Sequence, residues 1–136
     1  MVPSQATLTV DVRNTDEAIL RQVEQRVTDL VDAAAAAEGV TVERRTLARF
    51  EPVEFDPLSV DLVETTAQRL GLSTRRMPSG AGHDAQMLAR ICPTSMIFVP
   101  SVNGLSHNLA ELTEATDLQA GTDVLLQVVL QLANDG

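Results

Sequence analysis

The sequence predicts a mixed α and β (α/β) fold, because segments with the periodicity of strands alternate along the chain with segments of helical periodicity. In residues 7–13, Leu8, Val10 and Val12 face one way and polar residues face the other, which is the pattern of a half-buried strand. Between this segment and Gly39, apolar residues recur three and four positions apart, as they do on one face of a helix. Such alternation favours packed layers of helices and sheet.

The first helix is predicted between two local signals. Asn14 or Thr15 is the expected N-cap, and acidic residues fill the first turn, where the helix dipole favours negative charge. Gly39 is the expected C-cap. A second extended segment over residues 40–50 follows, so the first part of the chain is predicted to be strand, helix, strand. The apolar face of this helix consists of Ile19, Leu20, Val23, Val27, Leu30, Val31 and Ala34.

The second part of the chain opens with another helix. Asp56 is its expected N-cap, Pro57 suits its first helical position, and Gly71 stops it. A domain boundary is therefore predicted near residues 51–56, giving domains of residues 1–54 and 55–136. The later predicted elements are a short strand at 73–78, a short helix at 83–91, a buried strand at 95–99, and a last helix that Thr116 caps in a capping box with Gln119.

Composition limits the classes of partner. The chain has 136 residues, a formal net charge of -9, no Trp or Tyr and three Phe. An acidic surface is a poor match for nucleic acid or an anionic membrane, and there is little to stack bases on. The one cysteine, Cys92, allows no intrachain disulfide and is expected to be a buried apolar residue. We find no secretory signal and no apolar run of spanning length, so we expect a soluble, cytoplasmic protein.

The only two histidines lie in short polar segments, each with a carboxylate nearby. His107 lies in Gly-Leu-Ser-His-Asn-Leu-Ala-Glu, which ends at Glu111. A neutral imidazole there could ligate a metal, with Glu111 or a backbone group supporting the imidazole. Spacing alone favours the alternative, a polar loop histidine, because no HxxxH, HExxH or CxxC pattern accompanies it and a catalytic zinc needs about three protein ligands.

His83 follows a glycine-rich turn, Ser-Gly-Ala-Gly-His-Asp-Ala. Gly80 and Gly82 would let the backbone approach a substrate, with His83 as a hydrogen-bond partner. A plain glycine turn with a histidine near a helix cap is about equally supported. Arg13 could bind a substrate carboxylate with its guanidinium fork, although the residues alone favour a surface ion pair with Asp11.

Taken together, these segments resemble a known family. The stretch GAGHDAQMLARICPTSMIFVPSVNGLSHNLAE resembles the C-terminal active-site region of the zinc-dependent amidases of the hydantoinase/carbamoylase family, and VPSQATLTVDVRNTDEAIL resembles the strand and helix of their smaller lid, or dimerisation, domain. That family includes N-carbamoyl-L-amino acid hydrolases, β-ureidopropionase and allantoate amidohydrolase. The resemblance implies a partial lid/dimerisation domain in residues 1–54 and the C-terminal part of an αβα metallopeptidase-like catalytic domain in residues 55–136.

The resemblance also implies roles for individual residues. His107 matches a histidine that ligates one metal of a pair, with zinc, manganese or cobalt as the cofactor, and Glu111 matches the acidic residue that supports it. No residue of the chain is implied as catalytic in its own right. The implied substrate-binding residues are Arg13, which grips the substrate carboxylate, and Gly80, Gly82 and His83, which line the substrate pocket.

The chain departs from the family pattern in what it lacks. The family's other ligands (two histidines, an aspartate and a glutamate) and its general-base glutamate lie in an N-terminal region that this chain lacks, Met1 stands in place of the lid asparagine, and Leu109 stands in place of a proline. The resemblance therefore implies the C-terminal portion of an amidohydrolase that cleaves carbamoyl or ureido C–N bonds of N-carbamoyl amino acids or related ureido acids. We expect it to be inactive without a complementing N-terminal chain, and the metal site to be incomplete. The alternatives are a non-enzymatic module that pairs as a homodimer, and a truncation remnant.

Overall fold

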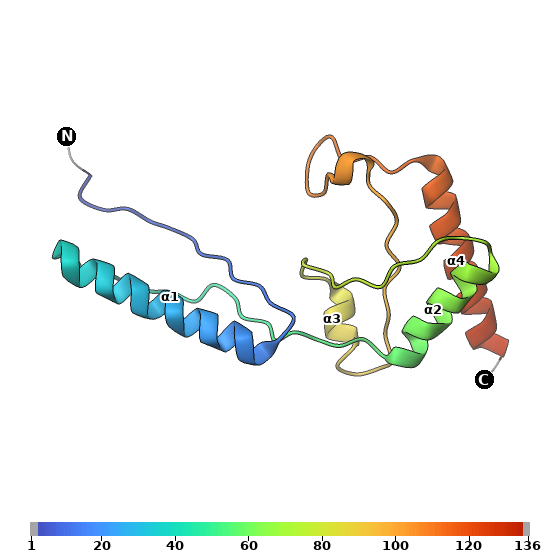
Figure 1. The fold of residues 1–136 in the computed structure, drawn as a ribbon, viewed down its shortest axis with the longest axis horizontal. Helices are drawn as coiled ribbons and strands as arrows, with labels where there is room; N and C mark the ends of the chain where they lie inside the picture. The colour runs from blue at the N-terminus through green and yellow to red at the C-terminus, as the bar shows by residue number, and fades with distance from the viewer. Residues whose placement is uncertain (1–2, 135–136) are drawn as a thin grey trace. The chain divides into compact units, whose positions relative to one another are not determined.

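The computed structural model describes residues 3–134 (Figure 1). The chain divides into two compact units, Met1–Val53 and Glu54–Gly136, next to the boundary that the Asp56-Pro57 helix start suggests. Unit 1 contains one helix, α1, among its described residues, whereas unit 2 contains α2, α3, a 3-10 turn and α4. No helix of the described chain is long and apolar enough to cross a membrane.

Helix α1 spans Glu17–Glu38, and its N-cap is Asp16. An Asp16 carboxylate oxygen accepts the N–H of Ile19 at 3.0 Å, three residues on, as an N-cap side chain does. The prediction of Asn14 or Thr15 as the cap is therefore wrong, because Asn14 instead accepts the N–H of Asp16 at 2.8 Å and lies outside the helix. Gly39 ends the helix in the left-handed conformation, with φ 67°, as predicted.

The predicted strands of unit 1 are not formed. Residues 7–13 and 40–50 are extended, but no strand is assigned anywhere between residues 3 and 134, so the strand-helix-strand prediction is wrong. In Figure 1 both segments run as thin coils. A strand needs a hydrogen-bonded neighbour for its backbone, and alternation in one segment does not supply that neighbour. Leu8, which the alternation placed on a buried face, is 88% exposed.

In unit 2, α2 spans Pro57–Arg69 and begins as predicted. The Asp56 carboxylate accepts the N–H of Ser59 at 2.7 Å, and Pro57 occupies the first turn, where its missing N–H costs nothing. Gly71, with φ 77°, follows the helix end. The chain then turns back, because the N–H of Leu72 donates to the carbonyl of Ala67 at 3.0 Å.

Helix α4 spans Ala115–Asn134. The predicted capping box of Thr116 and Gln119 is wrong, because the helical hydrogen bonds already begin before Thr116: the N–H of Leu118 donates to the carbonyl of Glu114 at 3.0 Å. Thr116 therefore lies inside the first turn, where its backbone is helical and its side chain cannot act as the N-cap.

Helices α2 and α4 pack against each other and form the core of unit 2. Ala67 of α2 and Val124 and Val128 of α4 are its buried residues. The predicted strand at 95–99 is extended but unpaired, and it lies against this helix pair. The partly buried apolar residues around the core are Leu62, Val63, Leu72 and Ile97.

Helix α3 is shorter than predicted, spanning only Asp84–Leu88. The chain after it passes through turns to Cys92, whose thiol is exposed. The prediction of a buried Cys92 is wrong, because apolar neighbours in the sequence do not ensure burial: Ile91 beside it is 81% exposed.

Candidate functional site

The loop that carries His107 is closed by its own hydrogen bonds. It opens with a 3-10 turn, η1, at Val102–Gly104. The N–H of Val102 donates to the carbonyl of Leu112 at 2.8 Å, which joins the two ends of the loop. Near the opening, the Ser101 hydroxyl donates to the carbonyl of Leu105. The loop is therefore a compact structure on the surface of unit 2.

His107 has an unusual backbone conformation for a residue with a side chain. Its φ is 56°, in the left-handed region, and Asn103 of the same loop has φ 58°. Residues other than glycine rarely adopt this conformation, because the Cβ atom crowds the backbone. Where they do, neighbouring interactions hold them, and such positions gather at functional sites.

Glu111 contacts the main chain of His107. Its Oε2 atom accepts the backbone N–H of His107 at 2.8 Å. We expected Glu111 beside the imidazole, but the contact is with the main chain. A second local bond shapes the turn between the two residues, since the Asn108 side-chain oxygen accepts the N–H of Ala110 at 2.9 Å. The carboxylate thus acts on the loop backbone, and the imidazole side of His107 is exposed.

His83 is the N-cap of α3. Its Nδ1 atom accepts the N–H of Ala85 at 3.1 Å. An accepting Nδ1 carries no proton, so in the neutral ring the proton resides on Nε2. The cap therefore fixes the tautomer, and the exposed side chain presents an Nε2–H donor.

The two glycines before His83 are not required by the turn itself. Neither Gly80 nor Gly82 has a positive φ, and a Cβ atom at either position would meet nothing within 4 Å. Gly71, by contrast, has φ 77° and a real conformational need for glycine. Nothing in the described structure therefore demands glycine at positions 80 and 82.

Arg13 is held by Asp11. The Arg13 Nε atom lies 3.0 Å from Oδ1 and 3.1 Å from Oδ2 of Asp11, and its Nη2 lies 2.5 Å from Oδ2. This hydrogen bonding lowers the pKa of Asp11 and raises that of Arg13. Both side chains are about three-fifths exposed, at 61% and 60%. The guanidinium fork is thus already arranged around one carboxylate.

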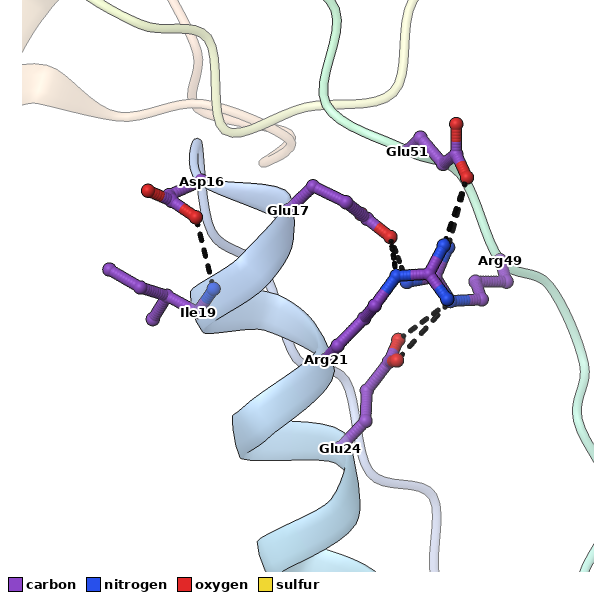
Figure 2. A network of polar contacts seen from close by, with 7 residues as sticks. All are labelled: Asp16, Glu17, Ile19, Arg21, Glu24, Arg49 and Glu51. Carbon is purple, nitrogen blue, oxygen red and sulfur yellow. Dashed lines mark hydrogen bonds and ion pairs between the residues drawn. The ribbon is translucent and has the colours of Figure 1, made fainter.

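Sequence reasoning missed an ion-pair network in unit 1, centred on Arg49 (Figure 2). Arg49 Nη2 lies 2.7 Å from Oε1 of Glu17, and Arg49 Nε lies 3.1 Å from Oε1 of Glu24. Arg21 reaches the same Glu17 oxygen at 2.6 Å and Glu51 at 3.3 Å. The helical spacing of the three charged residues on α1 was the available signal. The network attaches the extended segment to α1.

The Arg49 network also shifts the pKa values of its members. Hydrogen bonding from Arg49, aided by the charge of Arg21, lowers the pKa of Glu17, while hydrogen bonding to Glu17 raises the pKa of Arg49. In unit 2, Arg76 is similarly bound by Glu64 and Asp61, which raises its pKa. These pairs organise the surface and are distinct from the residues predicted to bind substrate.

The predicted site residues belong to different units. Arg13 lies in unit 1, whereas the His83 segment and the His107 loop lie in unit 2. Neither histidine ring hydrogen-bonds to the other. An open cleft of about 350 Å³ in unit 2 lies between residues 95–99 and α4 and is lined by neither histidine.

The described residues do not by themselves fit the metal that the family resemblance implies. Across residues 3–134, no three His, Cys, Asp or Glu side chains come together as a metal site. His107 offers a single imidazole, and a catalytic zinc needs about three protein ligands. The described chain can supply one ligand to such a centre.

Comparison with known proteins identifies the family. Residues 3–131 match Peptidase family M20/M25/M40. The chain belongs to this family. It is 41% identical over 133 residues to an allantoate amidohydrolase of Escherichia coli and 39% identical over 133 residues to an N-carbamoyl-L-amino-acid amidohydrolase of Rhizobium meliloti. These matches take in 98% of this M20 chain but only 32% of either relative.

Solved structures give the same assignment for this M20 family member. A hydantoinase/carbamoylase family amidase from Burkholderia multivorans superposes with a TM-score of 0.79 at 41% identity, covering 87% of this chain and 29% of that one. A second, from Burkholderia vietnamiensis, gives 0.80 at 38% identity, over 86% and 28%. The resemblance to this amidase family is confirmed, and the chain spans about a third of the length of its relatives. The likeness is consistent with the α/β class.

Proposed function

We propose that this chain contributes part of the active site of a metal-dependent amidohydrolase that cleaves a C–N bond of N-carbamoyl amino acids or related ureido acids. One observation carries the proposal: almost the whole chain matches amidases named for such substrates. The left-handed conformation of His107, whose side chain is exposed, supports it. Strain of this kind is retained where the geometry has a use.

The proposed roles follow from the chemistry of each group. His107 provides one imidazole ligand to a zinc, manganese or cobalt ion, and the other ligands come from outside the described residues. Arg13 exchanges the carboxylate of Asp11, which its fork contacts in this structure, for the carboxylate of the substrate. The His83 Nε2–H donates to an oxygen of the substrate. Gly80 and Gly82 line the pocket and leave room for the ligand.

The proposed domain roles follow the two units. Residues 1–54 form part of a lid or dimerisation domain, and residues 55–136 form part of the catalytic domain. The natural partner is a complementing chain that carries the remaining ligands, or a second copy that shares the lid. We place the protein in the cytoplasm, since its one cysteine, Cys92, is a free thiol suited to a reducing compartment.

A zinc titration by calorimetry tests the proposal first, with the His107→Ala chain as the matched control. One imidazole cannot hold a catalytic metal, so we expect no tight site and no hydrolysis of N-carbamoyl amino acids by the chain alone. Mixed with a polypeptide that supplies the missing ligands, the chain should bind zinc and hydrolyse the substrate, and His107→Ala should abolish both. Retention of activity in the mixed His107→Ala protein would overturn the role of His107.

The Arg13 role needs a separate test in the same mixed system. Arg13→Lys keeps the charge but removes the bidentate fork, and should raise KM for an N-carbamoyl amino acid about tenfold or more, as for a lost charge-assisted hydrogen bond. The matched control is Arg76→Lys, since Arg76 is an equally ion-paired arginine in the other unit. Equal effects of the two substitutions on KM would contradict a substrate role for Arg13.

A further inference from the structure

The conformation of His107 raises the question of what keeps it in place. A left-handed backbone is unfavourable for histidine, and the residue lies on an exposed loop where no packing encloses it. The hydrogen bonds at Asn108 shape the turn after His107, and the bond between Val102 and Leu112 joins the loop ends, but neither involves His107 itself. Among the described residues, the one hydrogen bond of His107 is the bond that its backbone N–H donates to Glu111.

We propose that Glu111 is a positioning residue that sets the direction of the His107 side chain by holding its backbone N–H, and that it acts without touching the imidazole. The inference rests on the proposed role of His107 as a ligand. Its physical basis is the 2.8 Å bond between the His107 N–H and Glu111 Oε2. Hydrogen bonds to a charged acceptor are about twice as strong as neutral ones. One such bond offsets the cost of a left-handed residue, which is of similar size.

In this arrangement the direction of the imidazole and its tautomer are set by different partners, whereas one carboxylate usually sets both for a metal-ligating histidine. A carboxylate on the ring would fix the tautomer as well as the direction of the imidazole. Here the carboxylate binds the main chain four residues before it, so both ring nitrogens are left to other partners. The direction of the Cα–Cβ bond follows from φ, and φ is what Glu111 holds.

The test is NMR of the full 136-residue chain, with Glu111→Ala and the conservative Glu111→Gln, which keeps an accepting oxygen. In Glu111→Ala we expect the His107 amide proton to shift upfield, its hydrogen exchange to rise roughly tenfold or more, and the couplings that report φ to leave the left-handed range. Glu111→Gln should restore most of all three. A matched control is Asn108→Ala, which removes a bond of the same loop and should leave the His107 amide shift and couplings unchanged.

Two results would overturn the proposal. One is a Glu111→Ala chain in which His107 keeps its amide shift and its left-handed couplings. The other is an equal loss in Asn108→Ala, which would mean that the loop as a whole, and not Glu111, sets the conformation. Neither result depends on metal or substrate. Failure of the proposed function would appear instead in the zinc and hydrolysis measurements on mixtures of the chain, with the Glu111 bond intact.

Discussion

At the scale of single residues, the backbone requires glycine at some positions and not at others. Gly71 needs its left-handed φ of 77°, whereas Gly82 has neither a positive φ nor a neighbour within 4 Å of a Cβ atom. The side chains of His83 and Glu111 both act on the main chain, and for His83 this is the helix-cap alternative that the sequence supported about equally. Each uses its side chain to bind a backbone N–H, so part of the predicted site is built by capping and turn chemistry.

The two glycines make a matched pair for experiment. Gly71→Ala should destabilise the chain by about 1–2 kcal/mol, the cost of a left-handed alanine. Gly82→Ala should be neutral, or stabilising by up to about 1 kcal/mol through a restricted unfolded state. Denaturant unfolding of both variants measures the difference. If Gly82→Ala is also strongly destabilising, the turn itself requires glycine, and its assignment to the substrate pocket loses its support.

At the scale of elements, local signals predicted some helix ends correctly, missed the N-terminal caps of α1 and α4, and did not predict strand pairing. The cap of α2 by Asp56 and the end of α1 at Gly39 depend on side chains within a few residues, and both were predictable. A strand at 7–13 depends on a neighbour elsewhere in space, which alternation cannot supply. The left-handed φ of His107 was not predictable for a related reason, because it depends on where the Glu111 side chain folds back.

The attachment of the segment around Arg49 to α1 is an element-scale interaction with a pH dependence. Arg49 lowers the pKa of Glu17 below its ordinary value of 4.5. A carboxyl group with a lowered pKa in the folded state stabilises above 4.5, and this contribution is lost as the pH falls through the folded pKa. We therefore expect the NMR chemical shifts of residues 44–51 to change in that acid range as the segment detaches from α1, and at a higher pH when salt screens the ion pairs.

Arginine substitutions test whether Arg49 itself lowers the pKa of Glu17. An NMR titration of the Glu17 carboxyl carbon should give a pKa below 4.5 in the parent chain and a value closer to 4.5 in Arg49→Gln. Arg76→Gln is the control, since Arg76 pairs with Asp61 and Glu64 in the other unit, and it should leave Glu17 unchanged. An unchanged Glu17 titration in Arg49→Gln would mean that Arg21 alone accounts for the pKa shift.

At the scale of the whole molecule, many large apolar side chains of both units are exposed. Helix α4 buries Val124 and Val128 against α2, yet Leu125 and Val129 on its other sides are 53% and 52% exposed. Apolar residues on more than one side of a helix are normally covered by neighbours, and exposed apolar surface can mark a face that binds other protein. The relatives, about three times as long by their 32% coverage, have further chain with which to cover such surfaces.

This surface predicts the behaviour of the isolated chain. It should bind a hydrophobic dye and associate as its concentration rises, and Leu125→Glu or Val129→Glu should reduce both effects while the α2–α4 core stays folded. Val128→Ala, in contrast, should destabilise that core by about 0.5–3 kcal/mol and increase dye binding. Sedimentation and dye fluorescence measure these differences.

Adding the part of the Escherichia coli allantoate amidohydrolase that this chain does not match should suppress dye binding if the exposed faces of α4 pack against that part. A monomeric chain that binds no dye would instead mean that the exposed faces of α4 are stable in water, and the case for a complementing partner would then rest on the missing metal ligands alone.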